Sequence, residues 1–399
     1  MPPRSRRLAA VLGLSAVAAL CIATSSAAAA PISGSYIVTL NSGDPAAVAA
    51  SDARRYGASV DHVYRDALRG YAAHMSATAA ARIASLDRVQ SVVQDQTVSI
   101  DAQTVPTGIN RIDGELSSTI SGNGSGAVNV DIAVIDTGIS AHPDLTIAGG
   151  VNCSTGGSSY ADGNGHGSHV AGTAAAKDDA NGVVGVAPGA RLWAVRVLNN
   201  QGSGSWSSII CGIDWVTARA STIEVANMSL GGTGTDTGCN DGGMHRAICN
   251  SVAAGITYTV AAGNESDNAA NHVPAAYDEA ITVSALADFN GLPTVGAATC
   301  RADVDETFAD FSNYGADVDI IAPGVCILST WKGGGYSTIS GTSMASPHAA
   351  GAAALYKSTN PAATPAQVKS ALQTTGNLGW NVATDRDAFH EVLLNVDAF

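Results

Sequence analysis

The sequence predicts an α/β protein in which helices cover both faces of a parallel β-sheet, preceded by a small α+β domain. From about residue 128, near-continuous apolar strands alternate with helices of small residues. Strands buried on both faces are typical of parallel sheets. Residues 31–101 differ, because their strands and helices follow a βαββαβ-like order. The 399 residues, 46% of them hydrophobic, suffice for one large core or two smaller ones.

The first thirty residues have the pattern of a secretory signal peptide. Three arginines among the first seven residues precede an apolar run over 8–23, and alanines follow at 27–30. The run is too short and too rich in alanine for a membrane span. We therefore expect residues 1–30 to be removed on export, and the extracellular product to have no membrane attachment.

Residues 31–101 are expected to form the small domain. Its expected strands are 35–40, 70–75 and 89–98, and its expected helices are 44–56 and 78–86. In the part from 102 to 399, we expect strands at 128–135, 191–197, 223–229 and 256–261. Helices are expected there at 166–176, 206–219, 247–254, 344–356 and 364–374. Functional residues of such sheets cluster where strands end, as Asp136 and Asn264 do.

Three short motifs carry residues suited to catalysis. Asp136 lies in Val-Ile-Asp-Thr-Gly, His166 in Gly-Asn-Gly-His-Gly-Ser-His, and Ser343 in Gly-Thr-Ser-Met-Ala at the start of a helix. Unpaired N–H groups at a helix N-terminus favour a developing anion. Taken alone, the serine motif would more often be a cap on an alanine-rich helix. Pro347 is expected in the first turn, where its missing N–H has no partner to lose.

Together, and in this order, the motifs resemble those of subtilisin-type serine proteases, nearest to the proteinase K branch. The resemblance covers about residues 103–356, and residues 31–101 resemble the inhibitory propeptide of that family, with an ordinary accessory domain as the alternative. It implies a secreted endopeptidase, made as a precursor that its own propeptide inhibits and that cleaves itself near residues 101–103. Polypeptides are the implied substrates. A formal charge of −14 argues against nucleic acid as a partner, and we expect a monomer.

The resemblance also assigns catalytic roles. Ser343 is the nucleophile, His166 transfers the proton and Asp136 orients the imidazole. Asn264, which by itself fits a turn after a strand, is the oxyanion donor with the backbone N–H of Ser343. An inactive relative serving as a binding module is one rival, against which these four intact residues argue. His169 is expected to be a packing residue; the other rival is a zinc-dependent hydrolase built on His166 and His169.

Two extended edges match the family segments that pair with the substrate backbone. They and the walls of the S1 pocket comprise Gly202, Ser203, Gly204, Ser229, Leu230, Gly231, Ala261 and Gly263. Main-chain pairing does not read side chains, so we expect broad specificity. The pocket walls carry no acid, and only Glu265 lies at the rim. The lack of acid in the walls favours apolar or aromatic P1 residues.

Two structural calcium sites are implied by the resemblance, and no catalytic cofactor. The first comprises the side chains of Gln103, Asp144 and Asp179 with the carbonyls of Lys177, Asn181 and Val183. The second comprises the Asp319 carboxylate with the carbonyls of Asp278 and Ala280. All-oxygen shells are those that calcium takes, although each acid alone also fits a solvated loop charge.

Six cysteines remain after the expected signal peptide, an even number that indicates disulfides but allows 15 connectivities. We expect consecutive pairing: Cys153 with Cys211, Cys239 with Cys249, and Cys300 with Cys326. Cys239 and Cys249 flank a short polar loop, and Cys153 and Cys211 are neighbours in the fold of the resembled family. The alternative is that one pair remains as buried thiols.

Overall fold

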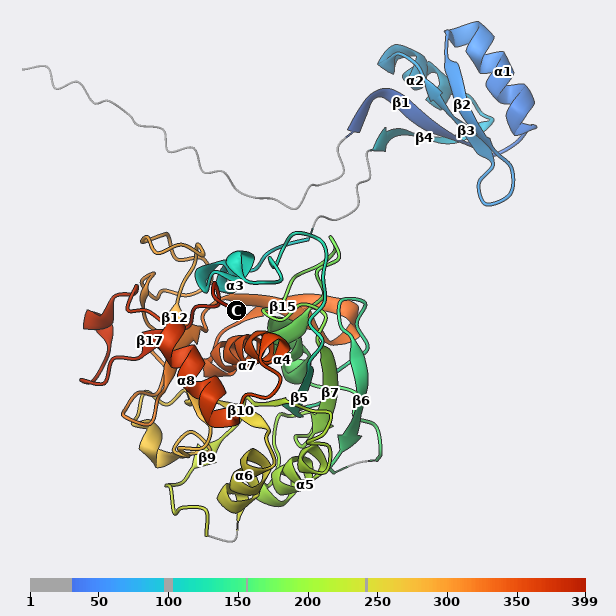
Figure 1. Ribbon diagram of the computed structural model, residues 1–399. Coiled ribbons are helices and arrows are strands. Elements are labelled where there is room, and N and C mark those ends of the chain that lie inside the picture. Colours follow the sequence, from blue (N-terminus) through green and yellow to red (C-terminus); the bar gives the residue numbers. More distant parts are fainter. Residues whose placement is uncertain (1–30, 97–102, 156, 241–242) are drawn as a thin grey trace, which may run out of the picture. The chain divides into compact units, whose positions relative to one another are not determined.

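The computed structural model describes residues 31–96, 103–155, 157–240 and 243–399. The expected signal peptide and residues 101–102 of the expected cleavage region lie outside these ranges. The chain divides into two compact units, Met1–Ile100 and Asp101–Phe399 (Figure 1).

The first unit is a four-stranded antiparallel sheet with two helices, in the strand order β2-β3-β1-β4. Its elements are β1 (Pro31–Leu40), α1 (Pro45–Tyr56), β2 (Ser59–Tyr64), β3 (Gly70–His74), α2 (Ala77–Ala84) and β4 (Val89–Gln96). This βαββαβ order confirms the expectation, and β2 is the strand for which no bounds were predicted. Asp44 caps α1 by accepting the Ala47 N–H at 2.9 Å, and Gly57 ends the helix with φ 70°.

The second unit is built on a nine-stranded sheet. Its order is β17-β14-β12-β10-β8-β5-β7-β6, all parallel, with β13 antiparallel beside β12. The strands are β5 (Asp131–Asp136), β6 (Ile147–Asn152), β7 (Arg191–Arg196), β8 (Val225–Met228), β10 (Thr257–Ala261), β12 (Ile281–Ala287), β13 (Thr307–Phe308), β14 (Ile320–Pro323) and β17 (Val392–Leu393). The chain fills the sheet in opposite directions from β5, so a crevice is expected beyond the carboxyl end of that strand.

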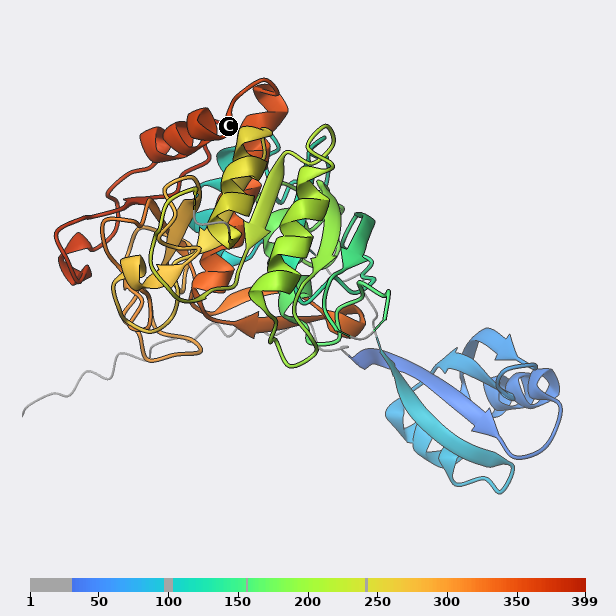
Figure 2. The same cartoon turned by 90° about the horizontal axis from the view of Figure 1, so that it is seen from below.

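Helices cover both faces of this sheet, which confirms the predicted fold class. Along β5, Ile132 and Val134 belong to the core under α4 and α7, whereas Ala133 and Ile135 belong to the core under α5 and α6. Figures 1 and 2 show α5 and α6 side by side. The helices are α3 (Thr107–Arg111), α4 (His166–Ala175), α5 (Trp206–Thr217), α6 (Met244–Ala253), α7 (Thr342–Thr359) and α8 (Pro365–Thr375).

Short elements complete the unit. They are two ladders, β9 (Gly232–Thr233) with β11 (His272–Val273) and β15 (Ile327–Trp331) with β16 (Gly335–Ile339), and the 3₁₀ turns η1 (Gly114–Leu116), η2 (Ala269–Asn271), η3 (Lys332–Gly334) and η4 (Val382–Thr384). None of the helices in the described ranges combines the length and apolar character needed to cross a bilayer.

Pro347 does not lie where the sequence suggested. Because α7 already begins at Thr342, the proline is its sixth residue. An N–H at this position would donate to the Ser343 carbonyl, but proline has none. That carbonyl instead accepts a hydrogen bond from Ser229 Oγ at 2.8 Å. Because the helical hydrogen bond is missing, the Ser343 carbonyl is available to Ser229, and this bond ties the N-terminus of α7 to the end of β8.

Candidate active site

Asp136 and His166 are in direct contact at the end of β5. His166 begins α4, and its Nδ1 lies 2.8 and 2.9 Å from the two carboxylate oxygens of Asp136, which is fully buried. The Thr137 N–H also donates to Asp136 Oδ1, at 2.7 Å. A side chain at Gly167 would clash with the Gly138 carbonyl at 2.2 Å, so this glycine lets α4 approach the strand.

Asp162 is a positioning residue that sequence reasoning missed. It is buried, and its Oδ2 accepts both the N–H and the hydroxyl of Ser168, at 3.0 and 2.7 Å. Its Oδ1 accepts the Gly165 N–H and the Thr137 hydroxyl, at 2.8 and 2.9 Å. An aspartate shortly before a helix is a capping signal, and this one holds the first turn of α4 against the end of β5.

The electrostatic environment of His166 favours its protonated form. Burial lowers the pKa of His166, but the charge of Asp136, its hydrogen bond and the charge of Asp162 outweigh burial, so the pKa lies above its ordinary value. A histidine held in this way is a strong proton acceptor whose imidazolium form is stabilised by the buried carboxylate.

Ser343 is the second residue of α7 and is only partly buried. Its hydroxyl donates to the Ser229 carbonyl at 3.3 Å, while Ser229 Oγ donates to the Ser343 carbonyl. This reciprocal pair holds the serine beside the end of β8. Rotation about the Cα–Cβ bond is the movement that redirects Oγ from this carbonyl.

Asn264 lies three residues after β10 and is exposed. Its Oδ1 accepts the N–H and the hydroxyl of Thr342, at 2.9 and 3.0 Å, and among the described residues its donor Nδ2 has no hydrogen-bond partner. A Cβ built on Gly341 would lie 3.8 Å from this Nδ2 and 3.7 Å from the Ser343 nitrogen. Two donors thus border one position at the N-terminus of α7.

Two cavities that share Leu230 and Gly231 in their lining border His166, Asn264 and Ser343. The larger, of about 780 Å³, is lined by His166 and by all six residues expected to form the substrate edges: Gly202, Ser203, Gly204, Ser229, Leu230 and Gly231. Leu198, Trp206 and Ile209 add apolar surface that sequence reasoning did not assign. Gly204 is needed because a Cβ there would meet the Val197 carbonyl at 2.6 Å.

The smaller cavity, of about 140 Å³, brings together Ala261, Gly263, Asn264 and Ser343 with Leu230 and Gly231. Glu265 is at its edge, with its side chain 56% exposed. Its Oε2 accepts the Asn264 N–H and the Asn313 amide, at 2.8 and 2.9 Å, and lies 3.6 Å from His272 Nδ1. Ala262, Val273 and Ala275 add apolar surface, His272 and Thr342 add polar groups, and the acid is at the rim.

His169 is a buried neutral histidine. Its Nε2 donates to the carbonyls of Ile327 and Ser337, at 2.9 and 3.1 Å, and burial lowers its pKa to about 3. In the described part of the chain, no group of three metal-ligating side chains includes His166 or His169. The geometry therefore gives no support to the zinc-hydrolase rival.

The residues of the first expected calcium site lie together. Gln103 Nε2 donates to the Lys177 carbonyl at 2.8 Å, Asp144 Oδ2 accepts the Val183 N–H at 2.9 Å, and Asp179 Oδ1 accepts the Asn181 N–H at 3.2 Å. Within the described ranges, the buried Oε1 of Gln103 has no hydrogen-bond partner, and burial raises the pKa of Asp144. An orphaned oxygen and a desolvated carboxylate in an all-oxygen set fit a hard cation.

The structure corrects the second expected calcium site. Lys369 Nζ donates to the carbonyls of Asp278 and Ala280, at 3.0 and 2.8 Å, and lies 2.8 Å from Asp319 Oδ2. All three expected ligands are therefore occupied by one ammonium group from α8. The sequence pattern predicted that these oxygens lie together, but the cation among them is the Lys369 ammonium and not calcium.

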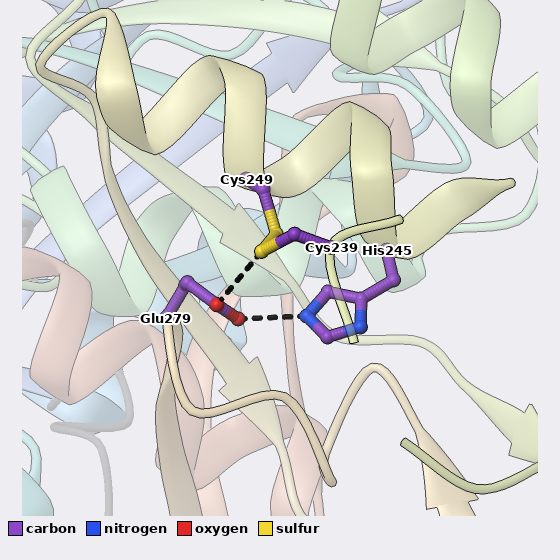
Figure 3. Close-up of side chains that lie close together, drawn as sticks. All are labelled: Cys239, His245, Cys249 and Glu279. Carbon is purple, nitrogen blue, oxygen red and sulfur yellow. Dashed lines mark hydrogen bonds and ion pairs between the residues drawn. A yellow bond between two sulfur atoms is a disulfide. The ribbon is translucent and has the colours of Figure 1, made fainter. Parts of the chain in front are cut away.

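The cysteines pair consecutively: Cys153 with Cys211, Cys239 with Cys249, and Cys300 with Cys326. Each pair has its Cα atoms 5.9 Å apart, within the range disulfides require. Figure 3 shows the Cys239–Cys249 bridge beside His245, whose Nε2 lies 2.7 Å from Glu279 Oε2. Because both sulfurs are in the disulfide, neither offers the thiolate that a metal would need.

Comparisons with known proteins agree with this geometry. Residues 128–391 match the subtilase family of peptidases, and residues 35–101 match the peptidase inhibitor I9 family. The chain is 40% identical over 302 residues to subtilisin DY of Bacillus licheniformis, covering 74% of this chain and 99% of that protein. It is 42% identical over 274 residues to subtilisin Savinase of Lederbergia lenta, covering 69% and 92%. A solved cold adapted subtilisin-like serine proteinase superposes with a TM-score of 0.58 at 32% identity, over 73% of this chain and 97% of that one. The chain belongs to the subtilase family, and is a subtilisin-like serine endopeptidase with an I9 inhibitor propeptide domain.

Proposed function

We propose that the protein is a secreted endopeptidase that hydrolyses peptide bonds through Asp136, His166 and Ser343. The observation that carries the proposal is the contact of the buried Asp136 with His166 Nδ1 at the end of β5, beside the cavity that His166 and Ser229 line. With Nδ1 held by Asp136, the other nitrogen of His166 is available to exchange a proton with the nucleophile.

In the proposed reaction, the Ser343 hydroxyl leaves the Ser229 carbonyl, gives its proton to His166 Nε2 and attacks the substrate carbonyl. The oxyanion that forms is stabilised by the Asn264 Nδ2 and by the backbone N–H of Ser343, which border one position. His166 then protonates the leaving amine. Water repeats the sequence on the acyl-enzyme and restores Ser343.

The substrate backbone would pair with residues 202–204 and 229–231, so recognition depends little on side chains. The aliphatic part of the lining of the smaller cavity, from Leu230, Ala262 and Val273, supports an apolar or aromatic residue at P1. Because Glu265 is largely exposed and already accepts two hydrogen bonds, we expect it to add only a small preference for basic residues.

The I9 domain supports a precursor that the enzyme itself cleaves near residues 101–103. The clustered oxygens support a structural calcium ion, held by the side chains of Gln103, Asp144 and Asp179 with the carbonyls of Lys177, Asn181 and Val183. When bound there, calcium would neutralise the buried Asp144 and link the N-terminus of the mature chain to the loop after α4. It takes no part in the chemistry.

The test compares Ser343→Ala, His166→Ala and the double variant, each produced as the full precursor and assayed for turnover after a separate protease has removed the propeptide. Residues that act as one unit give non-additive losses, so each single variant should lose nearly all turnover of a peptide substrate, by roughly 10⁶-fold as in subtilisin, and the double variant little more. The Ser343→Ala precursor should keep its propeptide when pure. An active Ser343→Ala enzyme would refute the triad, and cleavage of that pure variant would refute self-processing.

A further inference from the structure

A histidine lies beside the acid at the rim of the smaller cavity. His272 lines this cavity together with Glu265, and its side chain is only 11% exposed. Its Nδ1 lies 3.6 Å from Glu265 Oε2, and its Nε2 lies 3.2 Å from Asp267 Oδ2. The imidazole is therefore placed between two carboxylates, one of which lines the cavity proposed to receive the P1 side chain.

The backbone holds His272 in this position. His272 begins β11 and pairs with Thr233 of β9 in a short antiparallel ladder. β9 starts at Gly232, directly after the expected substrate edge 229–231. The ladder thus fixes the imidazole beside the segment that is proposed to pair with the substrate backbone.

The two acids are held as well, by the fully buried amide of Asn313. Its Nδ2 donates to Glu265 Oε2 at 2.9 Å, and its Oδ1 accepts the N–H groups of Glu265 and Asp267, both at 3.0 Å. A hydrogen bond from the Asn268 backbone, followed by those from neighbouring side chains, holds the pKa of Asp267 below its ordinary value. This carboxylate therefore stays charged where histidines titrate.

These contacts determine which nitrogen of His272 gains and loses a proton. A carboxylate only accepts hydrogen bonds, and Asp267 is the nearer of the two acids, so Nε2 of the neutral ring carries its hydrogen and donates it to Asp267. Nδ1 is then the nitrogen that is protonated, 3.6 Å from Glu265 Oε2. The added charge is thus placed on the side of the acid that lines the cavity.

The other described neighbours of His272 are uncharged. β9 contributes a glycine and a threonine, η2 contributes alanines and an asparagine, and the remaining polar side chains of the cavity lining are Asn264, Thr342 and Ser343. Glu265 and Asp267 are therefore the charged groups that face the ring. They meet an imidazolium at low pH and a neutral imidazole at higher pH.

We propose that His272 makes the P1 preference of the enzyme depend on pH. Its imidazolium offsets the charge of Glu265 at low pH, and its neutral form leaves that charge to attract a lysine or arginine side chain at higher pH. The inference rests on the proposed peptidase function. Because both acids are about half exposed, solvent weakens the interaction, and the preference for a basic over an apolar P1 residue should change by about two- to fivefold.

The test measures a ratio, because a ratio of two substrates removes every titration that both share, including that of His166. Two peptides that differ only in lysine or norleucine at P1 compete for the mature parent enzyme between about pH 5.5 and about pH 8.5, where lysine stays charged. The relative rates give the ratio of the two kcat/KM values, which should rise about two- to fivefold with pH.

A ratio that does not vary with pH, with both peptides cleaved, would overturn this inference alone. If neither peptide is cleaved, the proposed function is refuted, and this inference with it.

Two variants assign the effect to its side chains. His272→Gln cannot gain a proton, so it should keep at every pH the ratio that the parent reaches at the upper end of the range. Glu265→Gln should lower the ratio there toward the parent's value at the lower end. Cleavage of the norleucine peptide shows that each variant is folded.

His390→Gln is the matched control, because His390 Nδ1 lies 3.0 Å from Asp385 Oδ2 but His390 does not line the cavity. Its ratio should follow that of the parent. A pH dependence that persists unchanged in His272→Gln would overturn the proposal, because another group would then be titrating.

Discussion

Lys369 Nζ lies 2.8 Å from Asp319 Oδ2 and completes its contacts with the carbonyls of Asp278 and Ala280. One lysine thus binds all three oxygens at which a metal ion was expected. An ammonium supplies one positive charge and three donors, which match two carbonyls and one carboxylate. The Lys369 ammonium therefore supplies the positive charge that a metal ion from solution would otherwise supply.

Replacing this lysine should make stability depend on calcium at that position. Lys369→Met leaves a carboxylate that is 13% exposed, and we expect unfolding in chelator to become easier by about 1.5–3 kcal/mol. Calcium should then restore more stability than it gives the parent. Thermal unfolding of the Ser343→Ala chain, with calcium and with chelator, measures both. Lys332→Met is the control, since Lys332 is exposed and binds one carbonyl; an equal calcium response in both variants would contradict the assignment.

The acid limb of the pH–rate profile should report the contact between Asp136 and His166. In the proposed mechanism neutral His166 is the base, so activity should rise as pH passes upward through its raised pKa. Asp136→Asn removes the charge that raises this pKa, and the limb should move to lower pH while kcat falls about 10⁴-fold, as in other triad proteases. The kcat/KM profile of the purified variant checks this. A limb at an unchanged pH would show that another group titrates.

Calcium should stabilise the protein through the first site. Binding to the folded state adds RT ln(1 + [L]/Kd), about 2.7 kcal/mol at a hundredfold excess over Kd. Asp144→Asn and Asp179→Ala should each reduce the calcium-induced rise in Tm, whereas Asp319→Asn should not. The comparison is made by calorimetry of the Ser343→Ala chain. A full response in both Asp144 and Asp179 variants would exclude this site.

Arg111 and Glu306 form a buried, doubly hydrogen-bonded ion pair, and Arg111 also donates to the Gly379 carbonyl at 2.7 Å. Arg111→Met would leave three buried acids together without their cation. We expect a loss of about 3–5 kcal/mol in the free energy of unfolding, measured with urea. Combining it with Glu306→Gln should cost less than the sum of the single changes, because the second removes the stranded charge. Strict additivity would mean that the pair is not coupled.

Asp288 should make stability fall as pH rises. Burial first, and then the neighbouring Asp305, raise the pKa of Asp288 to about 7 from an ordinary 3.8. Between these values the folded chain retains a proton that the unfolded chain releases, so stability decreases from about pH 4 to about pH 7. Asp288→Asn abolishes this titration and should be more stable than the parent at pH 8, with a smaller difference at pH 4. A difference in Tm that does not vary with pH would refute this account.

Three features could be predicted from the sequence because each depends on local pattern. They are the Asp…His…Ser order, the alternating strands and helices, and the residues that line the cleft. An apolar run ending in Asp136 is a buried strand, and Ser343 before alanine-rich residues begins a helix. Local reasoning failed by small amounts at element ends: α6 begins at residue 244 rather than 247, and α7 at 342 rather than 344. Strands β6, β12 and β14 had no predicted bounds at all.

The sequence by itself therefore determined the family and the fold class, and predicted the catalytic groups, since short motifs encode them. The tertiary structure alone decided what those groups contact. Lys369 reaches the Ala280 carbonyl across 89 residues, and Ser229 Oγ meets the Ser343 carbonyl across 114. Nothing in local pattern distinguishes a solvated lysine from one that replaces a metal ion, because the difference is the proximity of distant backbone oxygens, which only packing of the sheet and its helices creates.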